Sequence, residues 1–156
     1  MAEKTNVMRI LDKHKISYTA HSYLQTDAVS GVEVASVLGE NPAQVFKTLV
    51  TVGKSGGHYV FMIPVAEELD LKKAAACVGE KSVEMLKSKE LLPLTGYIHG
   101  GCSPIGMKKS FPTFIHRTAA DFATILFSAG KIGWQVEMPL EELQAVQPVQ
   151  TADLIV

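Results

Sequence analysis

The sequence predicts a mixed α/β protein, either α/β or α+β, built around a mixed β-sheet. Short segments with helix-capping residues alternate with runs rich in β-branched residues. Their order is helix, strand, helix, and then strands interleaved with short helices, which differs from a regular βαβ winding. Glycines and prolines stand mostly at segment ends, and no repeat or linker interrupts the chain. We therefore expect one domain over residues 1–156.

The predicted helices begin after residues that suit a helix N-terminus. Ser30 and Glu33 have the spacing of a capping box, and Gly39 suits the C-terminal end of the same helix. The predicted helices run from Thr5 to about Lys15, from Ser30 to Gly39, as a single turn at Asn41–Pro42, over Leu71–Val78 between Asp70 and Gly79, over Ser88–Leu92, and over Leu140–Val146 after Pro139.

The predicted strands are rich in β-branched and aromatic residues. Val45–Val52 and His58–Val65 flank a segment with three glycines, Gly53–Gly57, which predicts a hairpin. The other predicted strands are Ser17–Tyr23, Lys81–Met85, Thr113–His116, Thr124–Phe127 and Gly133–Met138.

Composition excludes several classes of protein. Fifteen basic residues against 16 acidic ones give a net charge of −1, which excludes a broadly basic nucleic-acid-binding surface. Two cysteines, Cys77 and Cys102, are too few for a disulfide scaffold or a four-cysteine zinc site, and the five histidines show no ligand spacing with them. We expect no metal and no cofactor. No signal peptide or membrane-spanning run is evident, so we expect a cytoplasmic protein.

The segment Gly96–Gly106 is the first candidate site. It holds four glycines and a proline, and its adjacent glycines at 100 and 101 let backbone N–H groups approach a ligand. Such groups can bind an ester carbonyl or an oxyanion. A tight structural loop explains the same composition equally well.

Lys47 is the second candidate, because it is a cation within an apolar strand. It shares one face of that strand with Val45 and Leu49. A lysine in this position either points into a polar cavity or protects a strand edge, which is the commoner role.

Three further features are weaker. Ser128–Gly133 joins two predicted strands as a simple turn or lets a bulky ligand approach. His99 and Cys102 could form a thiolate–imidazole pair, although closeness in sequence is poor evidence for that geometry. Lys108 and Lys109, with Arg117 nearby, form a basic cluster that is either a solvated face or a place for phosphate contacts.

Taken together, several ordered motifs resemble the YbaK family of Cys-tRNA(Pro) deacylases, free-standing relatives of the prolyl-tRNA synthetase editing domain. The resemblance covers roughly residues 4–143. The motifs that carry it are Phe46–Leu49, Leu69–Ala74, Val83–Met85, Thr95–Tyr97, Gly100–Gly106 and Ser128–Lys131.

The resemblance implies a mixed, partly closed sheet flanked by helices, and an enzyme that hydrolyses the ester between a wrong amino acid and tRNA. Cysteine and proline are close in size, so the synthetase cannot reject cysteine by binding alone. The implied partners are the acceptor end of tRNA(Pro) carrying cysteine and, transiently, prolyl-tRNA synthetase, which would hold a tRNA that this near-neutral chain binds weakly.

The family's site residues carry over by position. The implied catalytic residues are Lys47, Gly100 and Gly101. The implied substrate-binding residues are Tyr23, Ser30, Thr48, Ser103, Pro104, Ile105, Gly106, Ser128, Ala129 and Gly130. The chain departs from the family at two places: Ser30 stands where some members carry an aromatic residue, and Ile132 where an arginine is frequent.

The resemblance implies that the thiol of the substrate attacks its own ester. Two other readings remain open at this stage. One is a deacylase that acts on a broader range of small aminoacyl-tRNAs. The other is a module that binds tRNA or a synthetase without catalysis, although such a module has no need for the cation at Lys47.

Overall fold

The strands form two sheets in the computed structural model, which describes residues 4–156. The smaller sheet is antiparallel, in the order β1-β7-β6, with β1 at Thr19–Ser22, β6 at Ile125–Ser128 and β7 at Trp134–Met138. The larger has the order β4-β2-β3-β5-β8. Its strands are β2 (Phe46–Gly53), β3 (His58–Pro64), β4 (Val83–Met85), β5 (Thr113–His116) and β8 (Gln150–Ala152).

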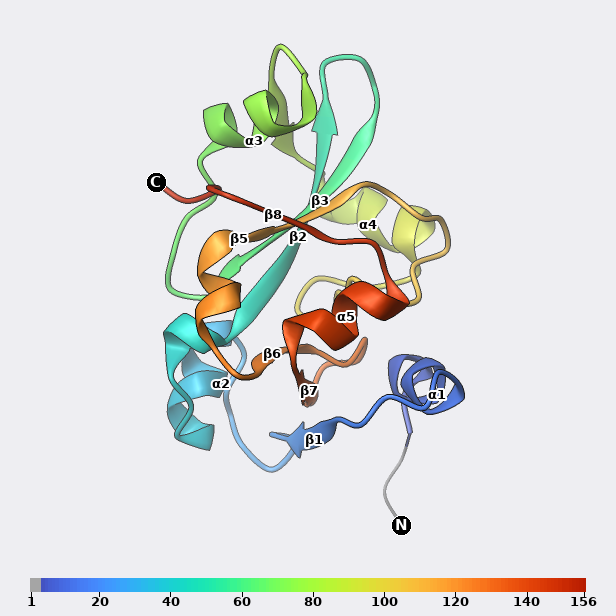
Figure 1. The fold of residues 1–156 in the computed structure, drawn as a ribbon, viewed down its shortest axis with the longest axis vertical. Helices are drawn as coiled ribbons and strands as arrows, with labels where there is room; N and C mark the ends of the chain where they lie inside the picture. Colours follow the sequence, from blue (N-terminus) through green and yellow to red (C-terminus); the bar gives the residue numbers. More distant parts are fainter. Residues whose placement is uncertain (1–3) are drawn as a thin grey trace.

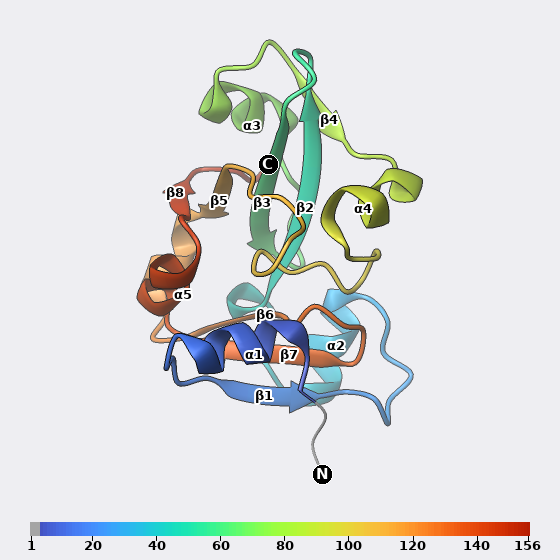
Figure 2. The same ribbon diagram turned by 90° about the vertical axis from the view of Figure 1, so that its right-hand side faces the viewer.

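Both pairing directions occur in the larger sheet. The β2–β3 hairpin and the β2–β4 pair are antiparallel, whereas β5 is parallel to both β3 and β8. A parallel bridge between Val45 and Leu126 links the start of β2 to β6 in the other sheet. The predicted mixed α/β class is confirmed, with its strands divided between two linked sheets. Figure 2 shows the strands of the two sheets running across one another.

Helices cover both sheets. α1 (Asn6–Lys13) and α2 (Gly31–Leu38) lie on opposite faces of the smaller sheet, as Figures 1 and 2 both show. α3 (Leu71–Val78) packs beside the larger sheet, where Ala74 and Ala75 join a cluster with Phe61 and Ile63. α4 spans Ser88–Thr95, α5 spans Leu140–Val146, and two 3₁₀ turns cover Pro42–Gln44 (η1) and Arg117–Asp121 (η2).

The predicted caps hold the helix ends. Thr5 accepts a hydrogen bond from the N–H of Met8, and Asp70 accepts from those of Lys72 and Lys73. The capping box at Ser30 is complete, because its side chain accepts from the N–H of Glu33 while the Glu33 carboxylate accepts from the N–H of Ser30. These caps fix where α1, α2 and α3 begin.

The sequence did not predict the 3₁₀ turn η2, and two further elements were predicted incompletely or not at all. The helix at Ser88 continues through Pro93 to Thr95, past the expected end at Leu92. It ends at Thr95 because Gly96 follows in the left-handed conformation and donates its N–H to the carbonyl of Leu92. β8 was missed because its sequence Gln-Thr-Ala is short and polar.

The main core lies between the sheets and the helices. Its fully buried members include Leu11, Met62, Ile115, Phe127 and Leu143. No helix in residues 4–156 is long and apolar enough to cross a membrane.

His116 ties the C-terminal segment to this core. His116 is 3 % exposed, and its Nδ1 accepts a hydrogen bond from the N–H of Leu154 at 3.2 Å, just beyond β8. Burial lowers the pKa of His116. Among its charged neighbours, Asp153 and Glu67 raise that pKa, and Arg117 and Lys73 lower it.

We expect the stability of the protein to fall as the pH drops below about 6.5, the ordinary pKa of histidine. The unfolded chain then binds a proton at His116 that the folded chain resists, so acid favours unfolding. The contribution should be at most about 1.4 kcal/mol per pH unit. Urea unfolding of the wild type and His116→Gln between pH 5 and 8 measures it. Identical pH slopes for the two proteins would contradict the assignment.

Candidate active site

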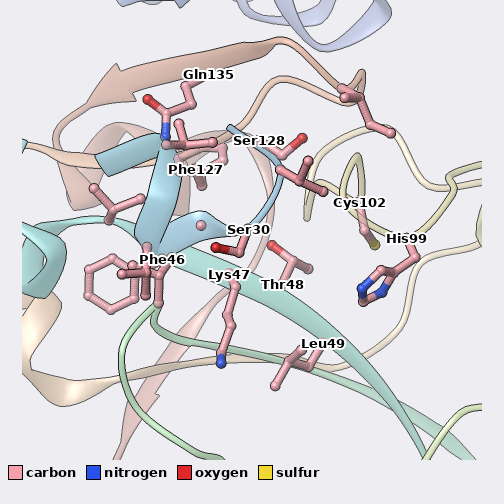
Figure 3. A pocket seen from close by; sticks show the side chains of 18 of the residues that line it. Ser30, Phe46, Lys47, Thr48, Leu49, His99, Cys102, Phe127, Ser128 and Gln135 are labelled. Carbon is pink, nitrogen blue, oxygen red and sulfur yellow. The ribbon is translucent and has the colours of Figure 1, made fainter. Parts of the chain in front are cut away.

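A cavity of about 730 Å³ opens where the two sheets meet. The residues before and at the start of α2 form one wall of the cavity, and β2 lines a second side. Residues around β4 and α4 line a third side. Further lining comes from Val65, from the end of β6, from Ile132, from β7 and from the glycine loop, here defined as residues 96–106. Figure 3 shows several of these side chains gathered around β2.

The cavity brings together residues that the sequence marks as candidates. Those that line it are Tyr23, Ser30, Lys47, Thr48, Gly100 and Ser128. They come from four separate parts of the chain, and the fold alone makes them neighbours. The cavity is thus the place where these six predicted site residues converge.

Lys47 supplies the free positive charge of this site. The ion pairs seen among the described residues join Asp12, Glu137 and Asp153 to other partners, and none involves Lys47. Glu33 also lines the cavity, but its carboxylate accepts hydrogen bonds from the N–H groups of Ser30 and Val29, which lower its pKa. The ammonium of Lys47 is therefore available to a ligand.

The hydroxyl groups of the cavity differ in whether they already take part in a hydrogen bond. Oγ of Ser30 accepts from the N–H of Glu33, and Oγ of Ser128 accepts from the N–H of Gly130. Oγ1 of Thr48 is buried and has no hydrogen-bond partner among the described residues. An unpaired buried hydroxyl is costly, so Thr48 is a natural contact for a ligand.

Gln135 contributes a buried amide to the wall. It is 5 % exposed, and hydrogen bonding orients its amide so that Nε2 donates to both carboxylate oxygens of Glu40, at 2.9 and 3.1 Å. Burial raises the pKa of Glu40. Sequence analysis missed Gln135, since one glutamine in a strand gives no signal.

His99 and Cys102 both line the cavity, but their properties argue against a catalytic pair. His99 is exposed at the rim, whereas Cys102 is buried, and burial raises the pKa of its thiol to about 12. No hydrogen bond joins the two among the described residues. A thiol with so high a pKa is a poor nucleophile near neutral pH.

The rest of the glycine loop packs inward. Residues 101–105 are all buried, and Ile105 belongs to the main core. Expected positions that do not line the cavity are Gly101, Ser103, Pro104, Ile105, Gly106, Ala129 and Gly130. Direct substrate contact at these positions stays a prediction, and two of them, Gly101 and Gly130, pack closely against neighbouring protein atoms.

Two glycines show what this packing requires. A Cβ on Gly106 would lie 2.9 Å from the Tyr97 hydroxyl, and one on Gly130 would lie 3.0 Å from Cε1 of the same ring. Both have positive φ, +80° and +88°. Gly101 packs against backbone, with its added Cβ 3.2 Å from the N of Ile132.

The described residues offer no cluster of metal ligands. Residues 4–156 contain no group of three or more His, Cys, Asp or Glu side chains that could hold a metal ion. The groups that the cavity presents to a ligand include the Lys47 ammonium, the hydroxyls of Ser30, Thr48 and Ser128, and apolar side chains.

Comparison with known proteins identifies the family. Residues 26–146 match the model of the aminoacyl-tRNA editing domain. A relative from Enterococcus faecalis (strain ATCC 700802 / V583), named as a candidate Cys-tRNA(Pro)/Cys-tRNA(Cys) deacylase, EbsC, is 46% identical over 153 residues, which are 97% of this chain and 93% of that protein. The chain belongs to the aminoacyl-tRNA editing domain family. The resemblance seen in the sequence is thereby confirmed.

Solved structures share the fold of this editing domain. A crystal structure described as a candidate trans-editing enzyme for prolyl-tRNA synthetase has a TM-score of 0.85 at 24% identity and covers 99% of each chain. The hypothetical protein APE2540 has a TM-score of 0.88 at 21% identity, covering 97% of this chain and 100% of that one. The fold is thus shared with these proteins although their sequence identity to this chain is low.

We expect Cys102 in the folded editing domain to resist alkylation. With a pKa of about 12, only about one thiol in ten thousand is ionised at pH 8, and the side chain is buried. Iodoacetamide treatment followed by peptide mass spectrometry should find Cys77 modified well before Cys102. Denatured protein, in which both cysteines react, is the control. Alkylation of native Cys102 at the rate of an exposed cysteine would contradict the assignment.

Proposed function

We propose that residues 1–156 form one trans-editing domain that deacylates mischarged tRNA, chiefly Cys-tRNA(Pro). The observation that carries this proposal is the cavity itself, whose described residues supply a cation at Lys47 but no hydrogen-bonded pair of nucleophile and base. Membership of the editing family supports ester cleavage of aminoacyl-tRNA. The name of the EbsC relative supports cysteine as the amino acid.

The chemistry that suits this site uses the substrate's own thiol. Its sulfur attacks the ester carbonyl, the new S–C bond forms as the C–O bond to the ribose breaks, and the thiol proton ends on the ribose oxygen. The nucleophile is tethered to its target, so its effective concentration is high. The cavity then needs only to hold the bent substrate and to stabilise the developing negative charge, which the Lys47 ammonium can do.

The near-neutral surface fits a role beside another tRNA-binding protein. A chain with a net charge of −1 makes few phosphate contacts and binds tRNA weakly by itself. Prolyl-tRNA synthetase, which holds the same tRNA, is the proposed transient partner. The proposed location is the cytoplasm, where aminoacyl-tRNA is made and used.

Replacing Lys47 by alanine should abolish most deacylation and leave the fold intact. Removing one electrostatic donor of this kind costs roughly 100- to 1,000-fold in rate. Single-turnover deacylation of Cys-tRNA(Pro) measures the loss, and thermal melting checks the fold. Lys54→Ala, an exposed lysine outside the cavity, is the matched control and should keep full activity. Wild-type turnover by folded Lys47→Ala would exclude the role given to this cation.

The protein should cleave Cys-tRNA(Pro) far faster than Ser-tRNA(Pro). The two substrates differ by one atom, so fit alone predicts a modest difference. A cysteine thiol with a pKa of about 8.5 is a few per cent thiolate near pH 7, whereas a serine hydroxyl is barely ionised. The rate on the cysteine ester should therefore rise from pH 6 toward the thiol pKa.

Single-turnover rates for both esters from pH 6 to 9, with spontaneous hydrolysis subtracted, test this. Equal rates and equal pH profiles would indicate attack by water and a deacylase of broader range. No cleavage of any aminoacyl-tRNA, with binding retained, would indicate a non-catalytic module.

A further inference from the structure

One edge of β2 lacks a partner strand where it passes the cavity. At its start, the bridge between Val45 and Leu126 links it to β6. On the same side, pairing with β4 begins only at Thr51. Over Phe46–Val50, the described strands pair with β2 only through β3 on its other side.

This open edge lies inside the cavity. All six consecutive residues from Val45 to Val50 line it. Successive side chains of a strand point to opposite faces, so a cavity that touches every residue must reach around the edge between those faces. Figure 3 shows Lys47 and Leu49 on one side of the β2 ribbon and Thr48 on the other.

The main-chain groups of Thr48 face the open edge. Odd-numbered residues bond toward β3: the Val45 carbonyl accepts from the N–H of Val65 at 2.9 Å, and the Gly53 N–H donates to the carbonyl of Gly57 at 2.7 Å. The Val50 carbonyl accepts from the N–H of Leu86 at 3.0 Å, on the opposite side. Because the direction alternates along an antiparallel strand, the N–H and C=O of Thr48 point away from β3.

We propose that the aminoacyl group of the substrate docks on this edge as one added strand residue. Its α-amino group donates to the carbonyl of Thr48, and its ester carbonyl accepts from the N–H of Thr48. An aminoacyl ester has the same N–Cα–C=O skeleton as a residue in a chain, so it can form both bonds of a hydrogen-bonded pair. This inference rests on the proposed function and deepens it.

The docking position explains the unpaired hydroxyl of Thr48. Directly opposed residues of an antiparallel pair place their side chains on the same face. An L-amino acid on this edge therefore projects its side chain beside Oγ1 of Thr48, which is buried without a partner. The D-enantiomer would project its side chain toward the face that carries Lys47. Binding at this edge thus selects for a substrate that has an α-amino group and the L configuration.

The N–H of Thr48 also has a role in the reaction. It faces the carbonyl oxygen on which negative charge develops during attack, and a fixed donor at that point stabilises the transition state. This role belongs to the main chain, so changes to the side chain alone leave it in place.

Two substitutions at Thr48 separate main chain from side chain. Thr48→Val removes the hydroxyl and keeps the N–H, whereas Thr48→Pro removes both. Proline is tolerated in a strand where the N–H faces an open edge, and this N–H bonds to no strand of the sheet. We expect Thr48→Pro to lower kcat/KM for Cys-tRNA(Pro) about 100-fold more than Thr48→Val does. Equal losses in two folded variants would overturn the proposal.

A substrate analogue provides a test that does not depend on how Thr48→Pro folds. 3-Mercaptopropionyl-tRNA(Pro) keeps the thiol and the ester but lacks the α-amino group. We expect the wild type to accelerate its hydrolysis, relative to the spontaneous rate, at least tenfold less than that of Cys-tRNA(Pro). Equal acceleration of the two would overturn docking on the edge while leaving the editing function in place. No acceleration of Cys-tRNA(Pro) itself would overturn the proposed function.

Discussion

The bridge between Val45 and Leu126 obliges the chain to pass from one sheet to the other within a few residues. Just before β2, Val45 is bridged to β6 of the smaller sheet, whereas β2 itself pairs with β3 in the larger sheet. β2 and β6 therefore separate soon after this bridge. Phe46 and Phe127, which flank this bridge in sequence, belong to the main core and also line the cavity. The cavity therefore lies next to the place where β2 and β6 are joined. The position of the site thus follows from how the two sheets are joined.

Local signals made most elements predictable. Capping residues at Thr5, Ser30 and Asp70 place the starts of α1, α2 and α3, and the glycines between β2 and β3 place the hairpin. These signals act between residues close in sequence, which is why one sequence reveals them. β8 has no such signal, because its formation depends on the neighbouring β5.

The site was predictable only in part. Lys47 stood out as a cation in an apolar run, and the resemblance to a family pointed to Tyr23, Ser30 and Ser128, all of which line the cavity. Glycines gave a weaker guide, since a chain needs glycine both near a ligand and at close packing contacts. Gly100 lines the cavity, whereas Gly130 packs against Tyr97 and Val7. Only the three-dimensional structure separates these two uses.

Tyr97 has a consequence for how much of the chain the site needs. Its hydroxyl donates to the carbonyl of Ile105, and its ring meets Gly130 on the far side, so one side chain holds two loops together. Val7 and Ile10 of α1 press against the same glycines at 130 and 106. α1 supplies no residue to the cavity, yet it acts as a brace for the loops that shape it. A shortened protein that begins after α1 would keep every residue lining the cavity and lose the support that sets their spacing.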